Sequence, residues 1–468
     1  MIIPPPAPAP TSFQALFQDV SGYTHELTDA NAARARVRSI VKSIRKRAAT
    51  LTDGDWSAAH KATSEYLPHV YAILKCVETD DLLLKNEPVF VWKSTLSTQP
   101  LKKSKQRTTL VSLHAELAAT LLTHAICLAN HAAVLVTSLG SYETSMTTSS
   151  AALKGHDETV NIAADMLCRA SGVLTHLAEV VIPRWEAAVG EEWRVRPVEF
   201  TRDVATALAK LFQADANLLA IRRLLSRAIS VAHSTTTPGP PLSSSHPSPS
   251  LLAKLHLHVY TLYDEARSLA KAASHHQGAQ GEISPQLRRY LSDGRSLSQA
   301  LAFKWLGVDC GENGGSEKSG DALGWLLMAK QELEDIQTKT SGIKTFKIGK
   351  GKAAGKSRKP KVVEELDSVA AFTSAYKKVN DTVHFRPVTP SSKLLLSVPA
   401  GRAALGLKPF SPPSPAFQPR GNGGGAGKHP VPPLRRGVDV DLSTLDVGDD
   451  SSDEGEVDDS YFGAGQYF

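Results

Sequence analysis

The chain has 468 residues, of which 41% are hydrophobic and 21% charged, and its formal net charge is +6. These proportions are typical of a soluble folded protein that carries polar extensions. No window holds the roughly 18 consecutive apolar residues of a membrane span, and the start MIIPPPAPAP lacks the basic and apolar regions of a signal peptide. We therefore expect the protein to stay in the cytoplasm.

The cysteines favour a reducing compartment. Cys76, Cys127, Cys168 and Cys310 stand alone, without a CxxC pair or a histidine at ligand spacing. Cys127 and Cys168 lie in apolar helical stretches, where a thiol usually behaves as a small buried hydrophobe. We expect reduced structural cysteines and neither a disulfide framework nor a metal site.

Charge is distributed unevenly along the chain. Residues 439–459 contain ten Asp or Glu and no Lys or Arg, whereas seven Lys or Arg fall within 34–47 and eight within 344–361. A basic segment can attract nucleic acid or an anionic membrane, but no nucleic-acid-binding motif accompanies these runs, and most such runs are solvated faces. We expect no nucleic acid as a partner and, for the early helix, a weak peripheral contact with anionic membrane. The residues expected to face that membrane are Arg34, Arg38, Lys42, Arg45 and Lys46.

Taken in chain order, the first half is helical after a short leader. The proline-rich residues 1–12 are expected to be a disordered leader. From about residue 28 to residue 232 apolar residues recur with the period of an α-helix, as in the stripe that runs from Leu110 to Leu135. The β-branched and aromatic segment 87–97, EPVFVWKSTLS, predicts a short strand or hairpin across the helices. Successive long helices with little strand signal indicate an all-α solenoid or bundle.

Low-complexity segments punctuate the second half. The Pro/Ser/Thr-rich residues 232–250 and the Gly/Lys-rich residues 338–361 are expected to be flexible inserts within one domain over residues 13–399. Residues 400–468, first Pro/Gly-rich and then acidic, are expected to be a disordered tail.

No motif predicts an enzyme or a cofactor site. The segment GKGKAAGKS, residues 349–357, has Lys350 where a phosphate loop needs its first glycine, and no buried strand precedes it. The pairs His256/His258 and His275/His276 are not spaced to bind a metal from one helical face. No nucleophile elbow, kinase loop or paired-carboxylate signature is present. We therefore expect a binding protein without cofactors, and rank an enzyme with an unrecognised site last.

Several strings, in order, resemble the BRO-domain family, of which ALIX is a member. In the first half these are EYLPHVYAILKCVE, EPVFVWKSTLS and LHAELAATLLTHAICLAN. Further on, LCRASGVLTHLAEVVIPRW and SLSQALAFKWLGVDCGENGGSEKSGDALGWLLMAKQEL are similar to later helices of the family. The string NDTVHFRPVTPSSKLLLSVPAGR is similar to the segment that closes the domain in a fungal pH-response branch of the family. The resemblance covers roughly residues 13–402.

The resemblance implies a curved, TPR-like helical solenoid that binds the C-terminal helix of the filament-forming ESCRT-III subunit. For the fungal branch it further implies a non-catalytic adaptor of ambient alkaline-pH signalling, with other components of that signalling complex as partners. Such an adaptor is recruited peripherally to endosomes or to cortical sites at the plasma membrane. There it promotes proteolytic activation of a zinc-finger transcription factor by a separate protease. A general endosomal-sorting adaptor unrelated to pH is the alternative.

Matching the chain to the hydrophobic patch of ALIX implies a partner-binding site. The match places Leu218 at an aromatic position of the patch, and Leu251 and Leu255 at its aliphatic pair, with Lys254 beside them. Leu255 also belongs to a core stripe with Leu252, so a buried position for Leu255 is an equal alternative. Leu251 lies beside that stripe and is the better candidate for the surface.

Overall fold

A computed structural model describes most of the chain. The described residues are 2–47, 51–98, 107–144, 149–190, 196–232, 240–244, 246–273, 279–341 and 358–421. The acidic run 439–459, the basic loop before residue 358 and most of the Pro/Ser/Thr-rich insert lie outside the described residues, so their predicted flexibility stays a prediction.

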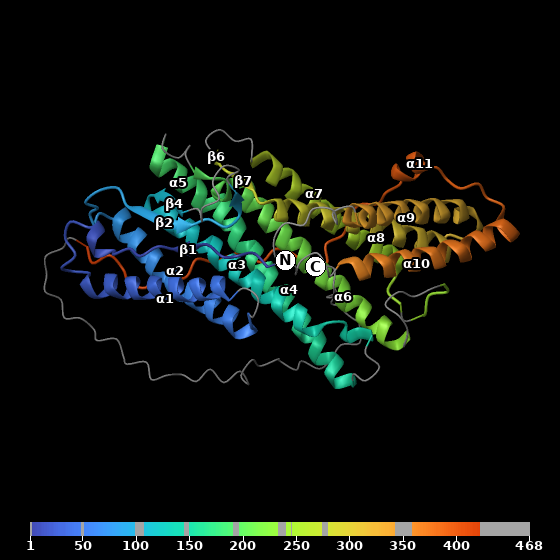
Figure 1. The fold of residues 1–468 in the computed structure, drawn as a ribbon, viewed down its shortest axis with the longest axis horizontal. Helices are drawn as coiled ribbons and strands as arrows, with labels where there is room; N and C mark the ends of the chain where they lie inside the picture. The colour runs from blue at the N-terminus through green and yellow to red at the C-terminus, as the bar shows by residue number, and fades with distance from the viewer. Residues whose placement is uncertain are drawn as a thin grey trace.

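The described chain is mainly helical, which confirms the predicted fold class. Its long helices follow one another and are α1 (Thr24–Lys46), α2 (Asp53–Glu78), α3 (Leu113–Leu139), α4 (Ser150–His176), α5 (Ile182–Val189), α6 (Arg202–Ala232), α7 (Pro249–Ala273), α8 (Pro285–Asn313), α9 (Ser319–Ser341) and α10 (Arg358–Val379). A short α11 (Ser391–Leu395) follows. From α1 to α4 each helix packs against the next, α4 packs on α6, and the series then continues to α10, so the array is elongated with α1 near one end and α8–α10 at the other (Figure 1).

The predicted strand segment forms the centre of a small antiparallel sheet. Strand β2 (Val89–Lys93) pairs with β4 (Arg107–Val111), with Val89 opposite Val111, and β1 (Ala7–Pro8) adds to the other edge. Phe90 and Trp92 point into the core from β2. The remaining strands are two residues long and are β3 (Ser97–Thr98), β5 (Arg196–Pro197), β6 (Ala279–Gln280) and β7 (Glu282–Ile283).

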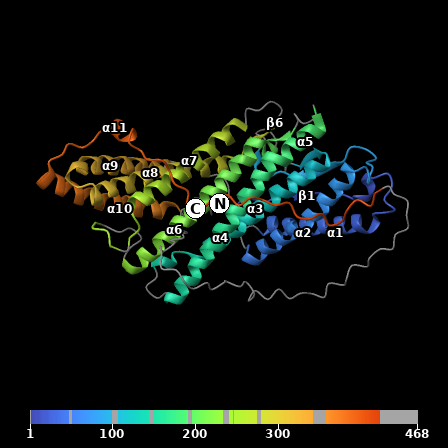
Figure 2. The same cartoon turned by 180° about the vertical axis from the view of Figure 1, so that it is seen from behind.

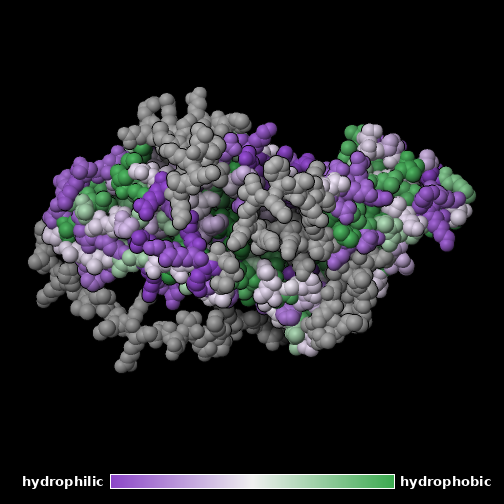
Figure 3. Space-filling view, viewed as in Figure 1, coloured by the Kyte–Doolittle hydropathy of each residue, from purple (hydrophilic) through white to green (hydrophobic). Residues whose placement is uncertain are grey.

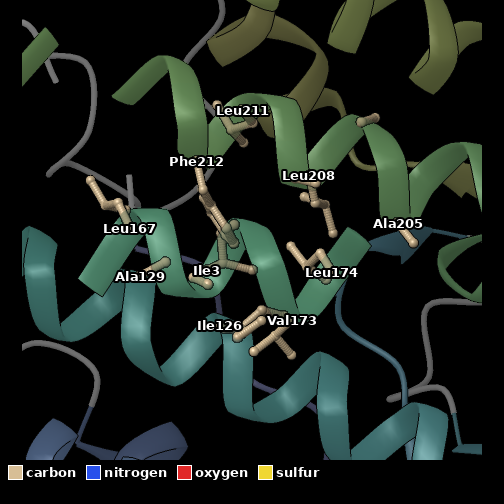
Figure 4. Packing of buried hydrophobic residues seen from close by; sticks show 14 of the residues in the cluster. Ile3, Ile126, Ala129, Leu167, Val173, Leu174, Ala205, Leu208, Leu211 and Phe212 are labelled. Atoms are coloured by element: carbon tan, nitrogen blue, oxygen red, sulfur yellow. The ribbon is translucent and has the colours of Figure 1, made fainter. Parts of the chain in front are cut away.

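The leader is not disordered, which corrects the sequence-based prediction. Ile3 is buried and lies among side chains of α3, α4 and α6 (Figure 4). Asn130 of α3 holds it there: the Ile3 N–H donates to Asn130 Oδ1 at 2.9 Å, and Asn130 Nδ2 donates to the Ile3 carbonyl at 2.6 Å. Pro8 sits opposite Trp92 on an edge strand, where a missing N–H is tolerated. The prolines therefore extend the leader without excluding it from the fold.

The folded part also continues past Pro399, the predicted boundary. Residues 397–421, called here the strap, run back from α11 along the helices toward α1 (Figures 1 and 2). The half-buried side chains of the strap that pack on the core are Val398, Ala404, Leu405, Phe410 and Phe417. The first part of the predicted tail is thus docked, and the rest of that tail, residues 422–468, lies outside the described residues.

Within the described ranges, three helical segments are long and apolar enough to cross a membrane by length and composition alone. The most apolar is α3, but 78% of its 18-residue window is buried inside the fold. Neighbouring helices surround it, and both α2 and α4 pack against it. Its apolar character therefore has a packing explanation within the array.

Candidate functional site: a face of α6 and α7 crossed by the strap

The predicted partner-binding leucines do not share one environment. Leu218 on α6 and Leu255 on α7 are only 3% and 2% exposed, because both belong to the main core. Leu218 therefore does not line an open groove, which corrects its predicted place, and for Leu255 the structure agrees with the buried alternative. Leu251 is half-buried and packs at the edge of the core, as its position beside the core stripe predicted. Lys254 is also half-buried.

The strap crosses α7 next to Leu251. The Arg402 N–H donates to the Lys254 carbonyl at 2.9 Å, and Gly401 lies against the backbone of His258. At about 100° per residue, His258 is about 40° and Leu251 about 60° from Lys254 around the helix. Leu251 therefore borders the line along which the strap lies, whereas Leu255 at about 100° turns toward the core.

On α6 the strap is held by a buried asparagine next to Leu218. Asn217 is 2% exposed, and its Oδ1 accepts from the Ala404 and Leu405 N–H groups at 2.9 and 3.0 Å. Its Nδ2 donates to the Gln213 carbonyl at 2.8 Å. A side-chain amide thus replaces the strand partner that an extended backbone needs, and the strap joins α6 to α7 beside both predicted leucine positions.

The rest of the strap is held against the helices by a close backbone contact and by hydrogen bonds. A Cβ at Gly172 of α4 would lie 1.8 Å from the Lys408 carbonyl, so only glycine fits there. Further on, the Ala416 N–H donates to the Pro68 carbonyl of α2 at 3.0 Å. At the end, the Arg420 N–H donates to the Tyr23 hydroxyl at 2.8 Å, and its guanidinium lies 4.9 Å from the Tyr23 ring centroid. Burial and Asp81 raise the pKa of Tyr23, so its hydroxyl stays protonated.

The basic helix α1 does not present all five predicted cations to a membrane. Arg34 is 2% exposed and forms a bidentate pair with the buried Glu116, with Nε to Oε1 at 2.7 Å and Nη2 to Oε2 at 3.2 Å. Tyr66 and Trp92 also donate to Glu116, at 2.8 and 2.7 Å, and the guanidinium bonds the Ala9 carbonyl. Arg34 is therefore a core residue that ties the leader to α3, which corrects its predicted role.

The other four cations all keep some access to solvent, and three of them share one stripe of α1. Arg38, Lys42 and Lys46 follow one another at i+4 spacing, with Lys42 and Lys46 exposed and Arg38 half-buried. Arg45 differs, because its guanidinium donates to the Pro5 carbonyl at 3.0 Å and burial lowers its pKa. The membrane-facing prediction is thus reduced to a three-residue stripe and stays untested.

The side chains of the described residues show little catalytic potential. Burial raises the pKa of Cys127 to about 12, and that of Cys76, Cys168 and Cys310 to about 11, which keeps these thiols protonated and weakly nucleophilic. Within the described residues, no three His, Cys, Asp or Glu side chains gather as a metal site would require.

Comparison with known proteins identifies the class. The BRO1-like domain matches residues 21–413, so the chain belongs to that family. The match includes most of the strap, in agreement with its docking.

The chain is also a homologue of fungal pH-response regulators. It is 34% identical over 98% of its length to the pH-response regulator protein palC of Cryptococcus neoformans var. neoformans serotype D (strain B-3501A), covering 97% of that protein. It is 23% identical to the palC protein of Yarrowia lipolytica (strain CLIB 122 / E 150), over 87% of this chain and 92% of the relative.

Solved structures of the same fold include ALIX and Bro1 domains. ALIX in complex with a SIVmac239 late-domain peptide superposes with a TM-score of 0.58 at 15% identity, over 89% of this chain and 50% of the ALIX chain. The ALIX BRO1–CHMP4C complex gives 0.57 at 15% identity over 97% of that chain. A Bro1 domain described in endosomal targeting gives 0.54 at 13% identity, over 87% of this chain and 92% of that chain.

Sequence reasoning missed the strap as part of the site. Its prolines indicated disorder, although its apolar residues Leu405, Phe410 and Phe417 recur and Gly401 permits close approach. That recurrence in an extended segment was the available signal. Its docking partner Asn217, 188 positions from Leu405, could not be found from a local pattern.

Proposed function

We propose that the chain is a non-catalytic adaptor of fungal ambient alkaline-pH signalling that binds the C-terminal helix of the filament-forming ESCRT-III subunit. The observation that carries the signalling role is the 34% identity to palC, which extends over 98% of the chain and thus beyond the domain alone. The ESCRT-III partner is supported by the shared fold of the ALIX BRO1 domain, which is seen in complex with CHMP4C.

The docking surface we propose is the α6–α7 face at Leu251 and Lys254, bordered by the strap. Helix-in-groove recognition needs an apolar anchor on the receiving surface, and Leu251 is the member of the predicted trio that is accessible. Leu218 and Leu255 then support Leu251 from the core instead of meeting the partner directly.

A pull-down with the ESCRT-III helix tests this surface. Leu251→Asp places a charge where an apolar helix face docks, and we expect affinity to fall at least about 30-fold, which corresponds to about 2 kcal/mol. Ile162→Asp on α4 is the matched control, since Ile162 is 45% exposed and the change is the same. Leu252→Asp should unfold the domain, because Leu252 is fully buried. Binding by folded Leu251→Asp at the wild-type level contradicts the proposal.

A deletion strain distinguishes the proposed role in pH signalling from a general role in endosomal sorting. Under the proposal, loss of the protein abolishes growth at alkaline pH and the proteolytic processing of the pathway's zinc-finger transcription factor, with recruitment to endosomes or cortical sites. The shared fold with a Bro1 domain of endosomal targeting supports the alternative, a general endosomal-sorting adaptor. Normal processing at alkaline pH together with defective sorting would select that alternative.

A further inference from the structure

The turn after α10 presents a phenylalanine in an unfavourable backbone conformation. A π-helical turn (Asn380–His384) ends at Phe385, whose φ of 53° and ψ of 33° are left-handed. Glycine is the usual residue at such a helix end because a side chain crowds the backbone there. A bulky residue in this region is uncommon and is held only when its surroundings impose the conformation.

Asn380 imposes that conformation. It is 5% exposed, its Nδ2 donates to the Arg386 carbonyl at 2.9 Å, and its Oδ1 accepts from the Arg386 N–H at 3.1 Å. The Phe385 N–H donates to the Asn380 carbonyl at 2.7 Å. After the turn, the Thr389 N–H donates to the Gly320 carbonyl at 3.2 Å, which ties the chain back to α9. The turn is therefore rigid on both sides of Phe385.

The rigid turn does not bury its apolar side chains. Phe385 is 74% exposed and Val383 65%, with Val388 at 47%, and these residues of 380–388 are called here the tip turn. The turn lies at the far end of the array, beyond the C-terminus of α10 (Figure 1). Leu395 at the end of α11 and Leu396 after it are 50% and 90% exposed, and hydrophobic residues gather over the α11 region in the space-filling view (Figure 3).

Basic residues flank the tip turn. Residues 377–396 contain four Lys or Arg and one Asp, and no acidic residue occurs from residue 382 to residue 421. Asp381 is neutralised by Lys377, and Glu317, the nearest acid of the adjoining loop, by Arg386. Lys378 and Lys393 are exposed on either side of the turn along the chain. Exposed apolar groups flanked by cations complement the interface of an anionic bilayer.

We propose that the tip turn is a membrane-docking site, in which Phe385 and Val383 enter the interface of a bilayer while Lys378 and Lys393 meet anionic headgroups. A turn at the end of the molecule with exposed apolar side chains can enter a lipid surface without rearrangement. The left-handed conformation of Phe385 serves this purpose, because it aims the ring away from the core.

Vesicle sedimentation of the full chain tests the proposal. Vesicles of phosphatidylcholine alone measure the apolar contribution, and vesicles with phosphatidylserine add the charge contribution. We expect Phe385→Asp to weaken partitioning about tenfold on both, and Lys378→Glu/Lys393→Glu to weaken it only where phosphatidylserine is present. Phe385→Trp should retain binding, since tryptophan suits the interface.

Phe385→Gly separates docking from folding. Glycine adopts the left-handed conformation without strain, so this variant should unfold at the wild-type temperature or above it and still lose vesicle binding. Ile162→Asp, the same loss of an exposed apolar side chain on α4, should bind vesicles normally. The proposal is overturned if wild type sediments with neither vesicle, if Phe385→Gly binds like wild type, or if Phe385→Asp loses the ESCRT-III helix instead of the vesicles.

Discussion

At the scale of single residues, two buried ion pairs of this fold are held by hydrogen bonds between distant elements. The Glu116 carboxylate accepts hydrogen bonds from Arg34, Tyr66 and Trp92. These bonds join α1, α2, β2 and α3 at one point. Lys304 of α8 and Glu365 of α10, 2.7 Å apart, make a second buried pair. Removing one member of such a pair leaves the other charged and desolvated, which is far costlier than losing an exposed pair.

Glu116→Gln measures that cost. We expect the free energy of unfolding to fall by about 3 kcal/mol, because the Arg34 guanidinium keeps its charge in a buried site without a counter-ion. Glu65→Gln is the matched control, since Glu65 pairs with Arg36 where the side chains are 40% and 63% exposed, and should cost under about 1 kcal/mol. Urea denaturation of both variants gives the comparison, and equal losses would show that burial of the Arg34–Glu116 pair has no special weight.

At the scale of elements, two proline-rich segments become part of the fold because partners elsewhere in the chain, among them one asparagine each, satisfy their backbones. Asn130 holds the leader and Asn217 holds the strap. The leader adds only a two-residue strand to the sheet, so the amide side chains supply further donors and acceptors to both segments. Where the strap backbone lies directly against a helix, as at Gly172, only glycine leaves enough room.

Gly172→Ala should release the strap from α4. The new Cβ would overlap the Lys408 carbonyl, so the extended backbone must move away. We expect hydrogen exchange of residues 404–410 to accelerate at least about tenfold, while the helices keep their protection.

The matched control lies on the same helix. No atom lies within 4 Å of a Cβ at Gly155, so Gly155→Ala should leave the strap protected and raise the free energy of unfolding by about 0.5–1 kcal/mol through helix propensity. Faster exchange of the strap in Gly155→Ala, or unchanged exchange in Gly172→Ala, would contradict this account.

At the scale of the whole molecule, the strap connects the far end of the array to its beginning. It starts after α11 and ends at Tyr23 and Asp81, beside the first helical pair. Its removal should therefore loosen the array, whereas the residues beyond it should matter little for folding. Chain 1–421 should unfold at the wild-type temperature, and chain 1–396 at least about 2 °C lower by calorimetry. Equal midpoints for the two truncated chains would show that the strap adds no stability.

The stability of the whole molecule should also fall in mild acid. Burial lowers the pKa of His60 to about 4 and those of His124 and His256 to about 3, against about 6.5 in an unfolded chain. The unfolded state therefore binds more protons below pH 6.5, so stability is complete above that pH and declines toward pH 4. As the pH falls through this window, each histidine lowers the free energy of unfolding by up to about 1.4 kcal/mol per pH unit.

Urea midpoints at pH 7.5 and pH 5 check this expectation. His124→Leu should reduce the difference between the two midpoints, because one buried titrating group is removed. His25→Gln should leave it unchanged, since the His25 side chain is 87% exposed. A difference as large in His124→Leu as in wild type would show that other groups cause the acid sensitivity.

The sequence by itself determined the helices, the strand at residues 89–93 and the family, because hydrophobic period and motif order are local properties that survive in any environment. It also placed Leu251 correctly beside the core stripe of α7. The tertiary structure alone decided the rest. Arg34 looked like one cation of a solvated run, yet Glu116, 82 positions away, makes it a core residue. The prolines of both ends indicated disorder, yet Asn130 and Asn217 dock them. Burial of a charge or of an extended segment depends on a partner distant in sequence, and no local pattern carries that information.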